Sequence, residues 1–160
     1  TIWALGCNAS NSKSVSKIFQ IKKRDKNKPL ICLLSHFNQL KHYVDPPTQK
    51  VREKLNLNTH PTVIYPNCTS KLDHVSNNKN ELAIRITPLK KLGLLIDAIQ
   101  SPIVSTSANV SGEPFPRKFE DIDKRIIDSV DIIFNFDTKS SGNPSKIIRI
   151  DEFGALQYIR

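Results

Sequence analysis

Hydrophobic positions along this 160-residue chain follow two patterns, one with the period of a helix and one with the period of a strand. Apolar residues recur at helical spacing in two segments, which predicts helices over 12–23 and 89–99. Asn11 precedes the first segment with a side chain suited to helix capping, and Pro102 follows the second. Weaker patterns predict short helices at 37–44 and 48–55, and another near 119–127.

Short apolar or alternating runs predict the strands. They lie at 30–34, 62–65, 82–86, 103–106, 131–134, 146–150 and 156–159, and the chain begins within another such run. Several of these strands follow one another with no helix between them, as in a mixed rather than a strictly parallel sheet. Neither a repeat nor a long linker interrupts the chain. We therefore expect a single α/β (α+β) domain over residues 1–160, with a mixed twisted β-sheet of about seven strands and flanking helices.

The composition narrows the choice of partners and compartment. With 24 Lys and Arg against 15 Asp and Glu, the net charge of +9 suits nucleotides, phosphates or RNA, although a basic surface that only aids solubility fits the charge equally well. Three scattered cysteines do not make a disulfide framework, which predicts a cytoplasmic setting. No apolar run approaches the roughly 18 residues of a membrane span, so we expect no membrane association. The start at Thr1 and the absence of Met lead us to expect that residues are missing before it.

Several familiar kinds of site are absent from the sequence. Neither G-x-x-x-x-G-K-[ST] nor G-x-G-x-x-G occurs, so the two standard phosphate cradles are missing. The four histidines have no metal-ligand spacing, so we expect no metal held by the protein. No G-x-S-x-G elbow occurs either, which argues against a classical serine nucleophile.

Cations at the ends of predicted elements are the first candidates for a site. Lys22 and Arg24 lie where the first predicted helix ends, and they could converge on an oxyanion or simply complement the helix dipole. Arg85 lies within an apolar strand, where a charge is unfavourable unless it meets an anion or faces solvent. The spacing alone leaves both alternatives open for each residue.

Small polar side chains at strand ends are the second group of candidates. The strand at 103–106 runs into Ser107 and Asn109, just before a glycine. A turn would explain one such residue, but the run Ser-Thr-Ser-Ala-Asn holds more of them than a turn requires. Ser107 and Asn109 are therefore candidates for a site, with turn formation as the alternative. Ser145 offers a free hydroxyl at the entrance of another predicted strand.

Taken together and in order, six segments resemble the YrdC-like family of threonylcarbamoyl-AMP synthases. They are TIWALGCNA at 1–9, IFQIKKR at 18–24 with KPL at 28–30, PT at 61–62, LAIRI at 82–86, STSANVSG at 105–112 and NPS at 143–145. The fifth matches the family's S-T-S-A-N-x-S-G almost letter for letter. The resemblance covers essentially the whole chain and implies a YrdC-like fold.

The resemblance also implies a reaction. The family joins L-threonine, bicarbonate and ATP to give threonylcarbamoyl-adenylate and pyrophosphate, for the t6A modification of tRNA, with Mg²⁺ carried in by ATP. It implies a catalytic set that holds bicarbonate and the ATP phosphates: Lys22, Arg24, Ser107 and Asn109. In this set Ser107 and Asn109 would act as neutral donors opposite Lys22 and Arg24. It implies nucleotide contacts from Arg24, Lys28, Thr62, Asn109 and Ser145, and threonine contacts from Arg85, Ser107 and Trp3, with Arg85 paired to the threonine carboxylate. Fixed cations and neutral donors suit a reaction that gathers anions.

The sequence departs from the family's pattern at some positions. Trp3 and Ala4 stand where the family has Tyr or Phe and Gly, and Thr87 and Lys146 replace a common Pro and Thr. The family's P-T-[DE] would fall before Thr1. Two other functions remain open: a non-catalytic RNA-binding module of the same fold, and a carbamoyl-adenylate-forming domain of a larger carbamoyltransferase. Any link to tRNA would otherwise run through the downstream transferase machinery.

Overall fold

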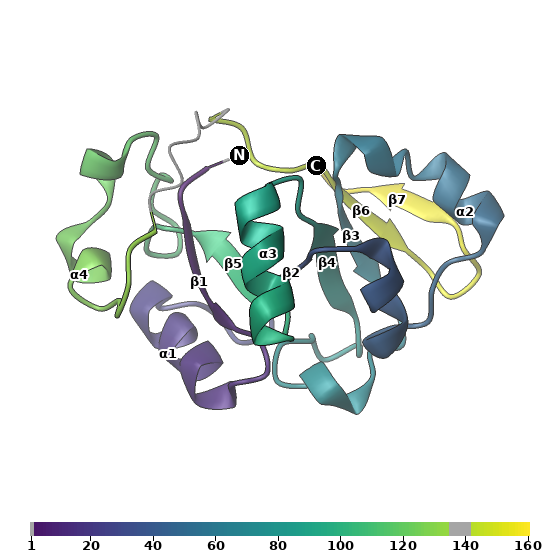
Figure 1. Cartoon of the computed structure of the whole chain (residues 1–160), viewed down its shortest axis with the longest axis horizontal. Coiled ribbons are helices and arrows are strands. Elements are labelled where there is room, and N and C mark those ends of the chain that lie inside the picture. Colours follow the sequence, from purple (N-terminus) through teal and green to yellow (C-terminus); the bar gives the residue numbers. More distant parts are fainter. Residues whose placement is uncertain (1, 135–141) are drawn as a thin grey trace.

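The computed structural model describes residues 2–134 and 142–160 as a sheet with helices around it (Figure 1). The strands are β1 (Ala4–Asn8), β2 (Ile31–Leu34), β3 (Thr62–Tyr65), β4 (Leu82–Ile86), β5 (Ile103–Ser107), β6 (Ile147–Ile150) and β7 (Leu156–Tyr158). The α-helices are α1 (Ser12–Lys22), α2 (Gln49–Lys54), α3 (Lys90–Ile99) and α4 (Lys124–Ile127). Short 3₁₀ helices, called 3₁₀ segments below, are η1 (Phe37–His42), η2 (Leu57–Thr59), η3 (Ser70–Leu72) and η4 (Phe119–Asp121).

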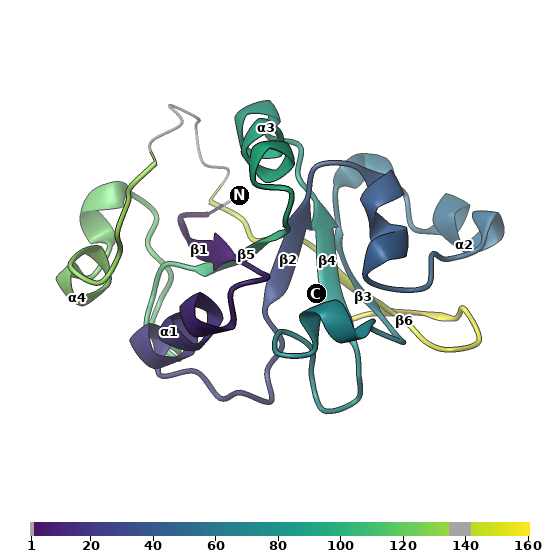
Figure 2. The ribbon, with the colours of Figure 1, turned by 60° about the horizontal axis from the view of Figure 1, so that its bottom comes forward.

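The seven strands of the described residues form one sheet in the order β1-β5-β2-β4-β3-β6-β7. The pairs β2–β4 and β3–β6 are parallel and the other four are antiparallel. The predicted mixed sheet with flanking helices is therefore confirmed. α1 lies beside β1, and α4 and α2 lie at opposite ends of the molecule in both views (Figures 1 and 2).

Local chemistry fixes both ends of α1. The Asn11 side chain accepts a hydrogen bond from the Ser14 amide at 3.1 Å, which supplies a partner that the first turn of a helix lacks. The helix ends at Lys22 because Lys23 adopts a left-handed conformation (φ 48°), and the amide of Lys23 returns to the Gln20 carbonyl. This ending places the Lys22 side chain at a defined point beside the end of β5.

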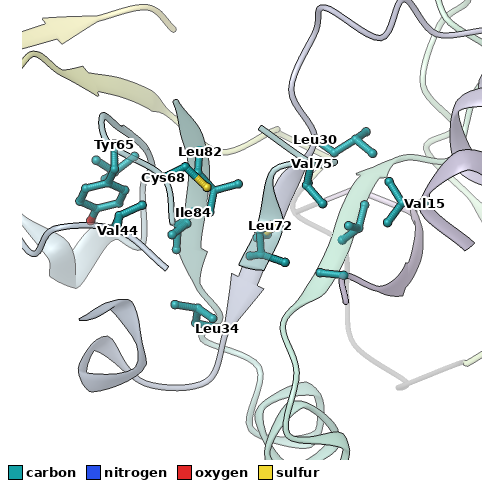
Figure 3. Close-up of a cluster of buried hydrophobic side chains, with 14 of the residues drawn as sticks. Val15, Leu30, Leu34, Val44, Tyr65, Cys68, Leu72, Val75, Leu82 and Ile84 are labelled. Carbon is teal, nitrogen blue, oxygen red and sulfur yellow. The ribbon is translucent and has the colours of Figure 1, made fainter. Parts of the chain in front are cut away.

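The two faces of the sheet differ in character. One face carries the hydrophobic core, in which Leu34 and Ile84 lie in one cluster with Val15 of α1 and Leu72 of η3 (Figure 3). Residues directly opposite each other on neighbouring strands share a face, and side chains alternate along each strand. The register therefore places Ser107, Arg85 and Thr62 together on the other face. The candidate residues on the strands thus lie on the side away from the main core.

Two of the predicted elements were wrong. Residues 131–134 form no strand: Ile132 is 67 % exposed, and other segments occupy every position of the sheet in the described residues. An apolar run becomes a strand only where a neighbour and a covering layer exist. The helix near 119–127 is split into η4 and α4, because Asp123 leaves the helical conformation (φ −55°, ψ 132°) and caps α4 by accepting from the Arg125 amide at 2.7 Å. The segment predicted as a helix at 37–44 is the 3₁₀ segment η1.

Candidate functional site

Lys22 is the centre of the first candidate cluster. Its side chain is buried, and its Nζ donates to the carbonyl oxygens of Ser107 and Asn109, both at 2.6 Å, and to Asn109 Oδ1 at 3.2 Å. The Ser111 amide donates to the Lys22 carbonyl at 2.8 Å, so the backbone of the helix end is joined to the same segment. Three acceptors match the three donors of an ammonium group. Lys22 therefore holds the segment that follows β5 in place.

The polar side chains of this segment bond to one another. Ser107 Oγ donates to Asn109 Oδ1, and Asn109 Nδ2 donates to the Glu113 carbonyl. The sequence led us to expect Ser107 and Asn109 as donors facing Lys22. The structure brings these residues together, but Lys22 meets acceptors rather than donors. The cation and the polar segment form one preorganised network.

Burial lowers the pKa of both cations of this cluster. Desolvation, together with the smaller effect of the nearby charge of Arg24, lowers the pKa of Lys22 to about 8. Burial also lowers the pKa of Arg24, against the opposing effect of Asp25. Arg24 donates from Nε to the Lys28 carbonyl at 3.2 Å and from Nη2 to the Pro29 carbonyl at 3.0 Å. Arg24 is thereby held against the chain that leads into β2, while the Lys28 side chain is exposed.

A second cluster lies where β3 and β6 begin. Thr62 is fully buried, and its hydroxyl lies 2.7 Å from that of Ser145. The Thr62 amide donates to the Lys146 carbonyl at 2.8 Å, and Arg160 donates to the Ser145 carbonyl from Nε at 3.3 Å and from Nη2 at 3.2 Å. The two hydroxyls expected to contact the nucleotide are thus brought together, and backbone and guanidinium contacts fix the segment that carries Ser145.

Arg85 belongs to this second cluster. It lies opposite Thr62 when the β3–β4 register is extended by one residue, and its Nε donates to the His60 carbonyl at 2.9 Å. Burial lowers the pKa of its guanidinium, and within residues 2–134 and 142–160 no carboxylate lies within 4.0 Å of it. A half-buried guanidinium without an acidic neighbour is suited to an anion that arrives from outside.

The two clusters lie toward opposite ends of the same sheet face. Ser105 and Ala83 both pair with Ile31 on β2, and Ser107 and Arg85 extend from that level in opposite directions. Four residue levels correspond to roughly 13 Å along the strands. An extended substrate can therefore contact both clusters, whereas a single small anion cannot.

Trp3 lies with the first cluster rather than with Arg85. Its carbonyl accepts from the Ala108 amide at 3.0 Å, and its ring packs on Phe119 at 5.3 Å between centroids. The residues expected to bind threonine are therefore divided: Trp3 and Ser107 lie near each other, and Arg85 lies at the other end of the face.

Three contacts of the clusters were missed by the sequence analysis. His60 and Arg160 act on Arg85 and Ser145 as described, and the Glu113 carbonyl binds Asn109. All three contacts use backbone carbonyls, which no side-chain pattern reveals. In the described residues no group of three or more His, Cys, Asp or Glu could hold a metal ion. Across that same part of the chain, the helices lack either the length or the apolar character to span a bilayer.

The sequence as a whole matches one protein family. Residues 1–160 match the Sua5/YciO/YrdC family, which is described as telomere recombination. The threonylcarbamoyl-AMP synthase of Buchnera aphidicola is 31 % identical over 154 residues, covering 94 % of this chain and 82 % of that protein. A putative threonylcarbamoyl-AMP synthase of Methanocaldococcus jannaschii is 30 % identical over 157 residues, covering 95 % and 72 % of the two chains.

Solved structures agree on the fold. P. abyssi Sua5 in complex with L-threonine superposes with a TM-score of 0.86 at 24 % identity, covering 100 % of this chain and 47 % of that one. E. coli YciO gives a TM-score of 0.78 at 21 % identity, covering 98 % and 77 %. The chain thus spans about half the length of the Sua5 chain that it matches. On the match over its full length, the chain belongs to the Sua5/YciO/YrdC family.

Proposed function

We propose that this chain is a threonylcarbamoyl-AMP synthase, which condenses L-threonine, bicarbonate and ATP and releases pyrophosphate. The observation that carries the proposal is the network of Lys22, Ser107 and Asn109, because the family resemblance placed its catalytic set on these residues. Two relatives that are about 30 % identical over most of the chain are named threonylcarbamoyl-AMP synthase and putative threonylcarbamoyl-AMP synthase.

We assign the two clusters to different parts of the substrates. Lys22 fixes the segment after β5, so that Ser107, Asn109 and the adjacent Arg24 form a rigid positive end for bicarbonate and phosphate oxygens. A preorganised polar group needs no rearrangement when charge develops in the transition state. Thr62 and Ser145, with Lys28 nearer the first cluster, would contact the nucleotide, and Arg85 would bind the threonine carboxylate bidentately.

Magnesium and the wider pathway belong to the same proposal. Mg²⁺ keeps most of its water and binds substrate phosphates readily, so we expect it to arrive on ATP rather than in a protein cage. The product would serve t6A formation in the cytoplasm, where tRNA is reached through a separate transferase. Direct RNA binding by the basic surface is a distinct property that a salt-dependent binding assay would detect.

The test is ATP-dependent pyrophosphate release, measured with threonine and bicarbonate omitted in turn. We expect release only when both are present, and we expect Lys22→Ala to abolish it. Lys23→Ala is the matched control, because Lys23 is the exposed neighbour and should keep activity. Full activity in Lys22→Ala would overturn the assigned role. Pyrophosphate release that depends on carbamoyl phosphate instead would assign the chain to carbamoyl transfer.

A further inference from the structure

The short turn before β3 has an unusual backbone. The 3₁₀ segment η2 lies between Asn56 (φ 44°) and His60 (φ 49°, ψ 53°), both in the left-handed region. The Thr59 amide donates to the Asn56 carbonyl at 3.1 Å, and the His60 amide donates to the Leu57 carbonyl at 2.9 Å. Residues other than glycine adopt this region rarely, because Cβ approaches the following carbonyl group, and Asn, Asp and His do so more often than the rest. A residue that precedes proline is restricted further, toward extended conformations. His60 is therefore held in a conformation that the following Pro61 disfavours.

The imidazole of His60 does not explain this conformation. Its Nδ1 is buried and has no hydrogen-bond partner in the described residues. An unpaired buried nitrogen is unfavourable, so the ring does not stabilise the turn through this atom. The contact that the conformation does produce is made by the backbone, where the His60 carbonyl accepts from Arg85 Nε at 2.9 Å. Strained residues held by their surroundings cluster at functional sites.

That contact determines how Arg85 is presented. Nε is engaged by the carbonyl, and the structure gives Nη1 and Nη2 no protein partner within the described residues. A guanidinium is planar, so fixing Nε restricts the orientation of the two remaining nitrogens, which can then bind both oxygens of a carboxylate. The neighbouring Thr62 on β3 keeps the strand that follows the turn fixed through Ser145.

We propose that His60 is a positioning residue: its left-handed backbone aims its carbonyl at Arg85 Nε and thereby orients the guanidinium for the carboxylate of the amino-acid substrate. This inference rests on the proposed function, in which Arg85 binds that carboxylate. It predicts that the backbone conformation at residue 60 matters for substrate binding and that the imidazole does not.

The experiment separates backbone from side chain in the pyrophosphate-release assay. His60→Gly and His60→Asn keep the left-handed conformation without the ring, and their KM for threonine should stay at the wild-type value. His60→Val introduces a β-branched residue that disfavours this conformation, and its KM for threonine should rise about tenfold, the effect of losing a hydrogen bond to a charged group. KM for ATP should change much less.

Asn56→Val is the matched control. Asn56 is left-handed at the other end of the same 3₁₀ segment and makes no hydrogen bond with Arg85, so this variant strains the turn without removing the contact. Its melting temperature should fall as in His60→Val, but its KM for threonine should not change. Equal KM values for threonine in His60→Val and Asn56→Val would overturn the inference, as would an increased KM in His60→Gly.

A further variant separates failure of this inference from failure of the proposed function. Arg85→Gln should raise KM for threonine, and an unchanged KM would refute the role of Arg85 itself. A raised KM in Arg85→Gln together with wild-type behaviour of His60→Val would refute only the role of His60. If His60→Val does not fold, His60→Ala compared with His60→Gly provides a milder strain. Equal KM values in that pair would also overturn the inference.

Discussion

The buried ammonium of Lys22 predicts an unusual pH dependence of stability. Its pKa falls from the ordinary value of 10.5 to about 8 in the folded chain, mainly because burial removes water from the charge. The unfolded chain therefore binds more protons than the folded chain between these two values. At about 1.4 kcal/mol per pH unit, the difference corresponds to about 3 kcal/mol. The free energy of unfolding should rise by this amount, relative to a chain without Lys22, as the pH rises from 8 to 10.5.

The comparison is between the wild type and Lys22→Met, which keeps the length of the side chain and removes the charge. Urea denaturation followed by circular dichroism, at intervals of one pH unit from 7 to 11, gives the difference in unfolding free energy at each pH. Below pH 8 the burial penalty of Lys22 is fully present, and its three hydrogen bonds offset part of it. Lys23→Met corrects for removing a positive charge at the end of the same helix. A difference that is constant across this range, or that falls as the pH rises, would refute the reasoning.

Three further predictions concern packing, and urea denaturation tests each of them. A Cβ at Gly6 would lie 2.6 Å from the Val104 carbonyl oxygen, so Gly6→Ala should lower the unfolding free energy by roughly 1–3 kcal/mol; an unchanged value would show that the strands move apart easily. A Cβ at Gly93 inside α3 meets its nearest neighbour at 3.7 Å, so Gly93→Ala should raise stability by about 0.5–1 kcal/mol, and a loss would contradict this. Leu82 is fully buried and Leu94 is 71 % exposed. Leu82→Ala should therefore be destabilising by about 2–5 kcal/mol and Leu94→Ala by less than about 0.5 kcal/mol, and similar losses would count against the assignment of the core.

Local patterns were enough to predict most of the sheet. The apolar runs at 30–34, 62–65 and 82–86 form β2, β3 and β4. Each run has the length of a typical strand and is bounded by residues that favour turns. The run at 131–134 has the same local pattern, but the strand predicted there does not form. Whether an apolar run pairs depends on which sheet positions other segments have filled, and that information lies elsewhere in the chain.

The candidate site was only partly predictable for a related reason. The motif placed Lys22 near Ser107 and Asn109, and the structure brings them together. The sequence did not reveal that Lys22 bonds to carbonyl oxygens, because that depends on where α1 ends relative to β5. The left-handed backbone of His60 was also not readable, since nothing in a His-Pro-Thr sequence requires it.

The pairing of β1 with β5 constrains the order in which the chain can fold. Ala4 lies opposite Ser107, so among the described residues β1 pairs only with β5, a strand that is synthesised much later. β2 also pairs with β5, and only β2–β4 and β3–β4 can form earlier among these neighbours. Contacts between distant parts of a sequence form slowly, and unpaired strands favour association with other chains. The end of the candidate site that holds Ser107 is therefore assembled late, and until β5 is made β1 has only α1 beside it.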